Sequence, residues 1–512
     1  MRLSAPFALL LSLACSAQSG ITHFWSGALH PQGITIRART AEPDAMLRVA
    51  YCALPCTSAY AFSASVASSA ELDHVVPVQL TGLEPGRAYT YRFEVNGVID
   101  ESDERTGRFR TPLTDAHSFS FVAGSCNSEG EHPVWQAMAA QDPLFFLCTG
   151  DLHYMDPNSE DVEVHRAPYR DAVLNGSAMR AFFQGTPIAY VWDDHDFSGN
   201  GSDASSIGRL SAARVYREYA PHYPLYDDVS IHQAFTIGRV HFILSDLRSN
   251  KTPYSMMDVG QYTWLLQQFL HARNNGLVAC WVSPLTWNSE GWPENWACQP
   301  DERRAINDFL YAQQVKDVFI ISGDAHMLAI DDGTNADFST AQNLAYHYPI
   351  LQAAAISRYG SYKGGNFNQG GVFPNPFPWN GQFGEVKVED DGEQVCITLN
   401  GLRTDSMSTS VQLLNSYTFC RTPSIQDAIP EAATSALEAW YAQGAGLLVR
   451  GAPGAPISVR VNDAQGRLLK ELRAWASPES TLIALNELPP GLYTALLTQG
   501  DGRVALRFVR TD

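Results

Sequence analysis

The chain lacks long hydrophobic runs and an excess of positive charge. After its first 20 residues, no stretch approaches the ~20 consecutive apolar residues of a membrane-spanning helix, so no transmembrane segment is expected. Lysine and arginine number 35 against 54 aspartates and glutamates, which gives the 512 residues a formal net charge of −19. No nucleic-acid-binding surface is expected either, because no basic surface can dominate the field around the protein. An anionic substrate would need a local positive charge, such as bound metal cations.

The first 20 residues have the pattern of a secretory signal peptide. Arg2 supplies a positive start, residues 6–13 are apolar, and residues 15–17 (Cys-Ser-Ala) form a small-residue cleavage site. A lipoprotein signal at Cys15 is disfavoured, because Ser12 stands where leucine is usual. We therefore expect a secreted or cell-surface protein, exported by a signal peptide at residues 1–20.

Cysteine is scarce, with nine residues in the whole chain. Export permits disulfides, although their connectivity does not follow from the sequence. The pairs that are neighbours in the sequence are Cys52–Cys56, Cys280–Cys298 and Cys396–Cys420. Such pairing leaves Cys126 and Cys148; of these, Cys148 lies within an apolar run and is expected in the core.

Both ends of the exported chain predict small β domains. Residues 21–113 contain strands of period-two alternation, as in residues 89–95, and residues 80–89 resemble the tyrosine corner of a fibronectin-like sandwich. Residues 423–444 are expected to form a linker. Several short strands follow it, so residues 445–512 predict a second, smaller β-sandwich.

The central part, residues 114–422, predicts an α/β domain. Six apolar runs have the length of strands buried on both faces, and each ends in polar residues that can do chemistry. The runs cover residues 119–123, 144–148, 188–192, 240–244, 277–282 and 318–321. Helix-compatible stretches separate several of them. Because function in α/β folds gathers beyond the carboxyl ends of the strands, we expect the polar residues to form one site.

The densest of these polar clusters is Asp193-Asp194-His195-Asp196, directly after the third run. Three carboxylates in four positions repel one another unless a cation is near, and a metal ion is the first candidate. His195 could lie beside the metals without being a ligand and donate a proton. Whether Asp193 and Asp196 bind metal or only hold the loop stays open.

Five blocks resemble, in this order, the signature blocks of the PhoD-like (alkaline phosphatase D) metallophosphoesterases. They are Gly124-Ser125-Cys126, Gly150-Asp151-Leu152-His153-Tyr154, Trp192-Asp193-Asp194-His195-Asp196, Asp246-Leu247-Arg248 and Gly323-Asp324-Ala325-His326. The similarity extends over about residues 20–420. It implies a four-layer α/β/β/α metallophosphoesterase sandwich, here flanked by the N-terminal fibronectin-like β-sandwich and the C-terminal small β-sandwich. It also implies iron and calcium in the site, with other divalent metals left open.

The resemblance carries roles over to single residues. The implied metal ligands are Cys126, Asp151, Tyr154, Asp194, Asn200, Asp324 and His326. Asp151 would bridge two metals, with Asp194 and Asn200 on the calcium side and the others on the iron side. His195 is the expected proton donor. Arg248 is the expected phosphate contact, although it could equally pair with Asp246.

The expected function is hydrolysis of phosphate mono- or diesters by a metal-bound hydroxide. Candidate substrates are small-molecule phosphate esters or phospholipid- or nucleotide-type esters. The alternative is a surface-attached binding or adhesion protein with a non-catalytic phosphoesterase-like domain, which the complete set of ligand types disfavours. Residues 462–469 and 488–493 resemble the sorting domain of type IX secretion substrates, which implies the secretion machinery as a partner. Whether Trp287, Trp292 and Trp296 pack or line a pocket is undecided.

Overall fold

The structure is a computed structural model of the chain. It describes residues 20–510 except 58, 174–175, 292–293, 341–345, 362–363, 369–380, 405–407, 424–437, 443–445, 451–455, 464–466, 476–480, 486–487 and 500–501. Nearly all of the expected signal peptide, most of the expected linker and Trp292 lie outside the described residues. Among the helices that are described, none is long and apolar enough to cross a bilayer.

A nine-stranded mixed sheet forms the first main layer. In spatial order its strands are β21 (Val411–Arg421), β20 (Val395–Thr404), β19 (Gln382–Asp390), β10 (Phe119–Gly124), β11 (Phe146–Cys148), β12 (Ile188–Tyr190), β1 (Ile21–His30), β2 (Gly33–Thr40) and β6 (Val75–Thr81). β10, β11 and β12 are parallel neighbours, so their carboxyl ends lie at one edge. Three of the apolar runs expected to be strands are therefore adjacent.

A six-stranded sheet forms the second layer. Its strands, in order, are β13 (Gln233–Ile237), β14 (Val240–Leu244), β15 (Val278–Ser283), β16 (Val318–Ser322), β18 (Ile350–Ala353) and β17 (Leu328–Asp331). β14, β15 and β16 are parallel and supply the other three expected runs. The α/β prediction for the central part is confirmed.

Neighbouring residues of the central strands face opposite layers. The ring of Phe145 lies 5.4 Å from that of Phe242 in the second sheet, whereas the ring of Phe146 lies 6.0 Å from Trp135 in α1 (Val134–Ala139). Both faces of the strand are thus buried, which explains why residues 144–148 are continuously apolar instead of alternating.

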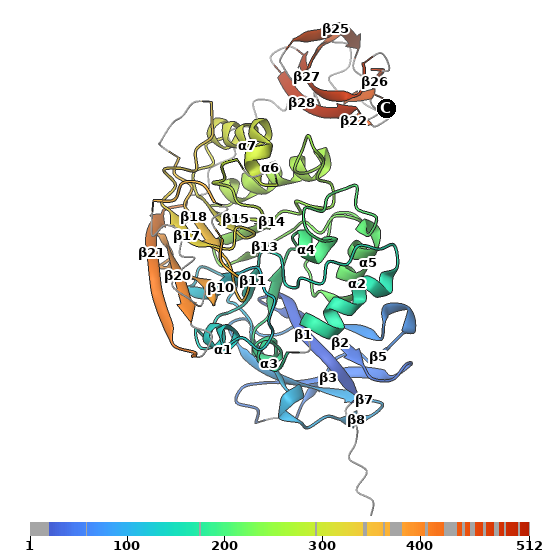
Figure 1. Cartoon of the computed structure of the whole chain (residues 1–512), viewed down its shortest axis with the longest axis vertical. Coiled ribbons are helices and arrows are strands. Elements are labelled where there is room, and N and C mark those ends of the chain that lie inside the picture. The colour runs from blue at the N-terminus through green and yellow to red at the C-terminus, as the bar shows by residue number, and fades with distance from the viewer. Residues whose placement is uncertain are drawn as a thin grey trace, which may run out of the picture.

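Helices cover the outer faces of the two sheets. Figure 1 shows α1 and α3 (Ser177–Gly185) beside the first sheet, and α6 (Val259–Asn274) and α7 (Pro300–Ala312) beyond the second. Three further α-helices are described: α2 (Val162–Pro168), α4 (Asp194–Phe197) and α5 (Arg209–Tyr219). Trp287 and Trp296 are buried and pack edge-to-face on Trp281 of β15, so they belong to the core under α6 and α7.

The N-terminal strands are fused to the first sheet. β1 pairs in parallel with β12 at Gly27 and Ile188, where a Cβ on Gly27 would lie 2.3 Å from the Ile188 carbonyl oxygen. The other layer consists of β3 (Met46–Ala53), β4 (Ala61–Phe62), β5 (Val66–Ala67), β7 (Ala88–Val95), β8 (Val98–Ile99) and β9 (Gly107–Arg110). The Tyr89 hydroxyl accepts a hydrogen bond from the Glu84 N–H at 2.9 Å. The predicted domain boundary at residue 113 therefore divides a single sheet, because β1, β2 and β6 come before it in the chain and the other strands of that sheet come after it.

The C-terminal strands enclose a core of their own. One sheet contains β22 (Glu438–Ala442), β23 (Gly446–Arg450) and β26 (Thr481–Ile483), and the other contains β25 (Leu468–Trp475), β24 (Pro456–Asp463), β27 (Gly491–Gln499) and β28 (Gly502–Arg510). Val449, Val459 and Phe508 are buried between them. The expected linker ends earlier than residue 444, because β22 pairs with β23.

Two of the three neighbouring cysteine pairs form disulfides. Cys52 is bonded to Cys56, and Cys396 is bonded to Cys420 across β20 and β21. Cys280 is a buried free thiol in the interior of β15, so its pairing with Cys298 is wrong. Cys148 is buried in the core, as expected.

Candidate metal centre

The expected ligands lie just beyond the carboxyl ends of parallel strands from both sheets. Cys126 follows β10, Asp151 follows β11, and Asp324 and His326 follow β16. These four residues have left-handed backbones, with φ between 52° and 61°. Such a conformation costs about 1–3 kcal/mol in a residue other than glycine and is concentrated at functional sites. The chain thus turns sharply at each of these positions and presents the side chain at the sheet edge.

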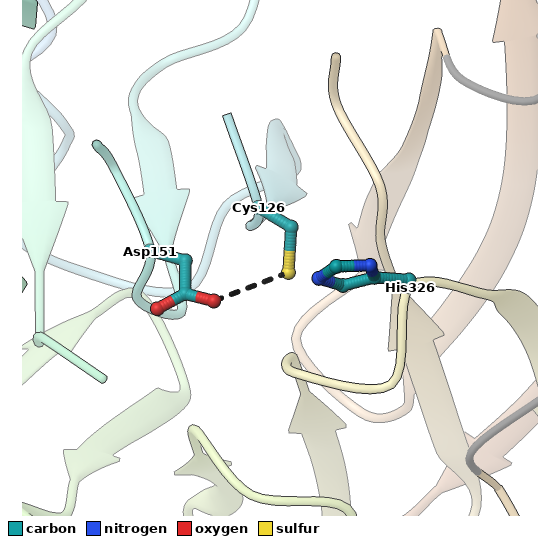
Figure 2. A group of neighbouring side chains, drawn as sticks. All are labelled: Cys126, Asp151 and His326. Atoms are coloured by element: carbon teal, nitrogen blue, oxygen red, sulfur yellow. Dashed lines mark hydrogen bonds between the residues drawn. The ribbon is translucent and has the colours of Figure 1, made fainter. Parts of the chain in front are cut away.

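A first group of donor atoms comes from Cys126, Asp151 and His326. One donor atom from each lies within 4.8 Å of the others, and Figure 2 shows the three side chains pointing toward one another from separate segments. The Cys126 Sγ is 3.7 Å from Asp151 Oδ2. Tyr154 joins them, because its hydroxyl is 2.8 Å from Asp151 Oδ2 and 2.9 Å from His326 Nε2. Four of the seven predicted ligands therefore converge here.

Hydrogen bonding orients the His326 ring. Its Nδ1 is 2.9 Å from the carbonyl oxygen of Tyr359, which can only accept, so Nδ1 carries the proton. The lone pair of Nε2 therefore faces Tyr154 and the group. A backbone acceptor on the distal nitrogen is the usual support of a metal-binding histidine.

A second group consists of Asp151, Asp194 and His195, and it shares Asp151 with the first. Asp194 Oδ1 accepts the backbone N–H of His195 at 2.9 Å, and Oδ2 accepts that of Gly201 at 2.8 Å. Burial would raise the pKa of Asp194, but Arg248 and His195 hold it below its ordinary value. One carboxylate common to two groups of donors is the arrangement of a bridging ligand between two metal ions.

The site carries an excess of buried negative charge. Burial and the neighbouring charges of Asp194, Asp193 and Asp196 raise the pKa of Asp151 well above its usual range. Burial and Asp151 likewise raise the pKa of the Cys126 thiol, and burial and Asp151 raise that of Tyr154. A bound cation would favour the ionised form of all of these groups.

The donor atoms fit metal ions of two kinds. Thiolate, phenolate and imidazole around Asp151 suit a transition metal, whereas the carboxylates on the Asp194 side suit a harder cation. Asp193 Oδ2 is buried and has no hydrogen-bond partner among the described residues, which leaves a further oxygen near Asp194.

Asp196 holds the loop that carries Asp151. Its Oδ1 accepts the backbone N–H groups of Leu152 at 2.7 Å and His153 at 3.2 Å, and its Oδ2 accepts that of Asp193 at 3.1 Å. Burial raises the pKa of Asp196 to about 7 in spite of these donors. Its two oxygens are therefore engaged with backbone and not directed at a metal.

Arg248 is an internal ion-pair partner. It is fully buried, and its Nε donates to Asp193 Oδ1 at 2.5 Å while its Nη2 lies 3.6 Å from Asp194 Oδ2. Burial would lower the pKa of Arg248, but these two aspartates hold it above its ordinary value. Asp246 instead accepts the backbone N–H of Arg248 at 3.0 Å, so the two side chains are not an ion pair. This placement supports a positioning role for Arg248 and not contact with a substrate.

Two predicted ligands lie outside the two donor groups. Asn200 is exposed, and it is the backbone of the next residue, Gly201, that contacts Asp194. Asp324 is buried, and its charge contributes to the raised pKa values of Cys126 and Asp193. Asp324 is thus within electrostatic range of the centre.

Two residues near the centre were not predicted from the sequence. Asp156 Oδ1 accepts the Nδ1–H of His195 at 2.5 Å, and its only sequence signal is its place soon after the Asp151 block. The guanidinium carbon of Arg358 lies 4.4 Å from the centre of the Tyr154 ring. Arg358 follows all five blocks, in residues 333–385, whose Gly-, Asn-, Pro- and aromatic-rich composition fits loops that wall a pocket as well as ordinary connecting loops. Nothing in the sequence singled out the arginine itself.

Two models of one protein family match most of the chain before the C-terminal strands. The model of the PhoD-like phosphatases matches residues 119–348, and the model of the N-terminal domain of PhoD-like phosphatases matches residues 16–113. Alkaline phosphatase D of Bacillus subtilis (strain 168) is 23% identical over 319 residues, which are 50% of this chain and 54% of the relative. The match thus spans about half the length of that curated relative.

Two solved structures share the fold. A structure of PhoD has a TM-score of 0.60 at 15% identity and covers 80% of this chain and 93% of its own. The purple acid phosphatase PPD1 from yellow lupin (Lupinus luteus) seeds has a TM-score of 0.53 at 12% identity and covers 77% and 73%. With more than half of its residues matched by the two models of one family, the chain belongs to the PhoD-like phosphatases, a family of phosphoester hydrolases.

Proposed function

We propose that the protein is a secreted, metal-dependent phosphatase that hydrolyses phosphate mono- and/or diesters. The observation that carries this proposal is the pair of donor groups that share Asp151, at the sheet edge where parallel strands end. Small-molecule phosphate esters and phospholipid- or nucleotide-type esters are the substrates considered. The secretory pattern of residues 1–20 supports export.

We assign iron to the side of Cys126, Tyr154 and His326, and calcium to the side of Asp194. The softer donors of the first side and the carboxylates of the second support this division. When bound, such ions would activate water at neutral pH and offset the negative charge of the phosphoryl group. Asp151, within reach of both groups, would hold the two ions together.

His195 is proposed to protonate the leaving alkoxide. Asp156 accepts its Nδ1–H and thereby fixes the ring, which leaves Nε2 as the nitrogen that exchanges a proton with the substrate. The ring centre of His195 lies 4.1 Å from that of Tyr154, so the imidazole borders the first donor group as well as the second. Arg248 contributes indirectly, by keeping Asp193 and Asp194 in place.

Residues 445–512 are proposed to act as a sorting domain read by a secretion machinery. The patterns of residues 462–469 and 488–493 support this proposal, as does the β core that these strands form together with β22. Expression of the chain with and without this segment, followed by measurement of the enzyme in the medium, tests it. Equal export of both forms would contradict it.

The enzymatic proposal is tested by hydrolysis of p-nitrophenyl phosphate and its bis ester. We expect Asp194→Asn and His326→Ala to abolish turnover while the fold, followed by circular dichroism, persists. Asp115→Asn is a matched control, because it removes a carboxylate charge from an exposed position outside both donor groups. Near-wild-type hydrolysis by either of the first two variants would refute the assignment.

A further inference from the structure

Arg358 places a positive charge beside the first donor group. Its guanidinium carbon is 4.4 Å from the centre of the Tyr154 ring, a distance at which a cation is attracted by the aromatic face. The hydroxyl of the same ring is 2.8 Å from Asp151 Oδ2 and 2.9 Å from His326 Nε2. The guanidinium therefore lies against the ring whose hydroxyl contacts two of the proposed ligands.

The backbone around Arg358 is fastened to the ligand segments. The N–H of Arg358 donates to the carbonyl of Cys126 at 3.0 Å, and the carbonyl of Tyr359 accepts from His326 Nδ1 at 2.9 Å. The N–H of Ser361 donates to the carbonyl of His326, also at 2.9 Å. Because three contacts join this short segment to two ligand-bearing segments, the Arg358 side chain starts from a fixed position relative to the centre.

Within the described part of the chain, the guanidinium N–H groups of Arg358 donate no hydrogen bond and contact no carboxylate. Other arginines that lie on aromatic rings differ in this respect. Arg48 lies 4.0 Å from the Phe62 ring centre and pairs with Glu94, and Arg421 lies over Phe419 and faces Asp317 at 3.6 Å. Arg248, the other arginine near the centre, is buried against Asp193.

We infer that Arg358 binds the phosphoryl group of the substrate and selects phosphate monoesters over diesters, an inference that rests on the proposed phosphatase function. A guanidinium presents a planar fork of N–H donors that matches phosphate oxygens and stays charged at any working pH. A monoester carries a third non-bridging oxygen and additional negative charge, whereas that oxygen of a diester carries the second ester group. A cation beside the centre therefore favours the monoester.

The test compares Arg358→Ala and Arg358→Lys with the unsubstituted full-length enzyme. We expect Arg358→Ala to lose about ten- to hundredfold in kcat/KM for p-nitrophenyl phosphate, mainly through KM, as for a lost hydrogen bond to a charged group. The bis ester should lose less, so that the monoester-to-diester ratio falls. Arg358→Lys should retain part of the preference, because it keeps the charge but not the fork. Arg48→Ala is the matched control and should change neither kcat/KM for p-nitrophenyl phosphate nor the monoester-to-diester ratio.

Equilibrium dialysis with inorganic phosphate gives a readout independent of turnover. Arg358→Ala should bind phosphate more weakly by a factor similar to the rise in KM, with unchanged metal content. An unchanged ester ratio, whether both esters are unaffected or slow equally, overturns the inference, as does unchanged phosphate binding. Loss of metal from Arg358→Ala also overturns it, because the arginine would then only support Tyr154. If the unsubstituted enzyme hydrolyses neither ester, the proposed function fails, while phosphate binding still tests Arg358.

Discussion

Replacing Arg248 by methionine tests whether its buried ion pair with Asp193 stabilises the segment that carries Asp193 and Asp194 beside the metal centre. Both side chains are 0% exposed, with Nε 2.5 Å from Asp193 Oδ1 and Nη2 3.6 Å from Asp194 Oδ2. Methionine fills much of the volume but leaves the charge of Asp193 uncompensated beside Asp194. Removing one partner of a buried ion pair costs about 3–5 kcal/mol, so we expect the free energy of unfolding to fall by this amount.

Urea unfolding followed by tryptophan fluorescence measures this loss. Trp192 reports on the region, because it is buried and its indole N–H donates to Asp246 Oδ1 at 2.9 Å. The double variant Asp193→Asn/Arg248→Met removes both charges and should be more stable than Arg248→Met alone. Arg304→Met is the control: its pair with Asp301 is about half exposed, and such pairs contribute about 0–1 kcal/mol.

A loss for Arg248→Met no larger than that of the Arg304→Met control would refute this reasoning. A double variant no more stable than the single one would refute it too, because the cost would then come from lost packing and not from an unpaired charge.

Two further predictions concern Asp156, which contacts His195, and Glu302, in the first turn of α7. Asp156→Asn should lower kcat for alkyl phosphates about ten- to hundredfold and that for p-nitrophenyl phosphate less, because a good leaving group needs little protonation; equal losses for both would contradict proton donation by an oriented His195. Burial raises the pKa of Glu302 to about 7. The folded protein therefore holds this proton between pH 4.5 and 7 while the unfolded chain has lost it, and stability falls with rising pH by about 3 kcal/mol. Glu302→Gln should remove this part of the pH dependence in unfolding measured at pH 5 and pH 8; an unchanged slope would contradict the assignment.

The strand ends were predictable because parallel strands buried on both faces appear in the sequence as short, continuous apolar runs. Residues 144–148 are apolar at every position since Phe145 and Phe146 face different layers, and Asp151 follows at once. A polar residue directly after such a run can only lie at the sheet edge. That reasoning placed Cys126, Asp151, Asp194 and His326 near the sheet edge, and the resemblance to the PhoD-like family implied that they are metal ligands. All four belong to the two donor groups.

The partners of these residues were less accessible to sequence reasoning. The alternation of residues 33–39 indicates a strand but not which strand it pairs with, so the continuation of the first sheet through β1, β2 and β6 was not foreseen. Arg248 pairs with Asp193 across the chain instead of with its near neighbour Asp246, because the loop turns the Asp246 carboxylate toward backbone N–H groups. The position of Arg358 near the centre depends wholly on the backbone hydrogen bonds that join its loop to Cys126.

The metal content of the purified chain tests the central claim most directly. We expect elemental analysis of full-length protein prepared without added metal to find two ions per chain, with one retained by His326→Ala. Asp151→Ala should lose both, because Asp151 is the carboxylate that the two donor groups share. Protein that binds no metal even when metals are supplied, or an Asp151→Ala variant that keeps both ions, would contradict a shared two-metal centre.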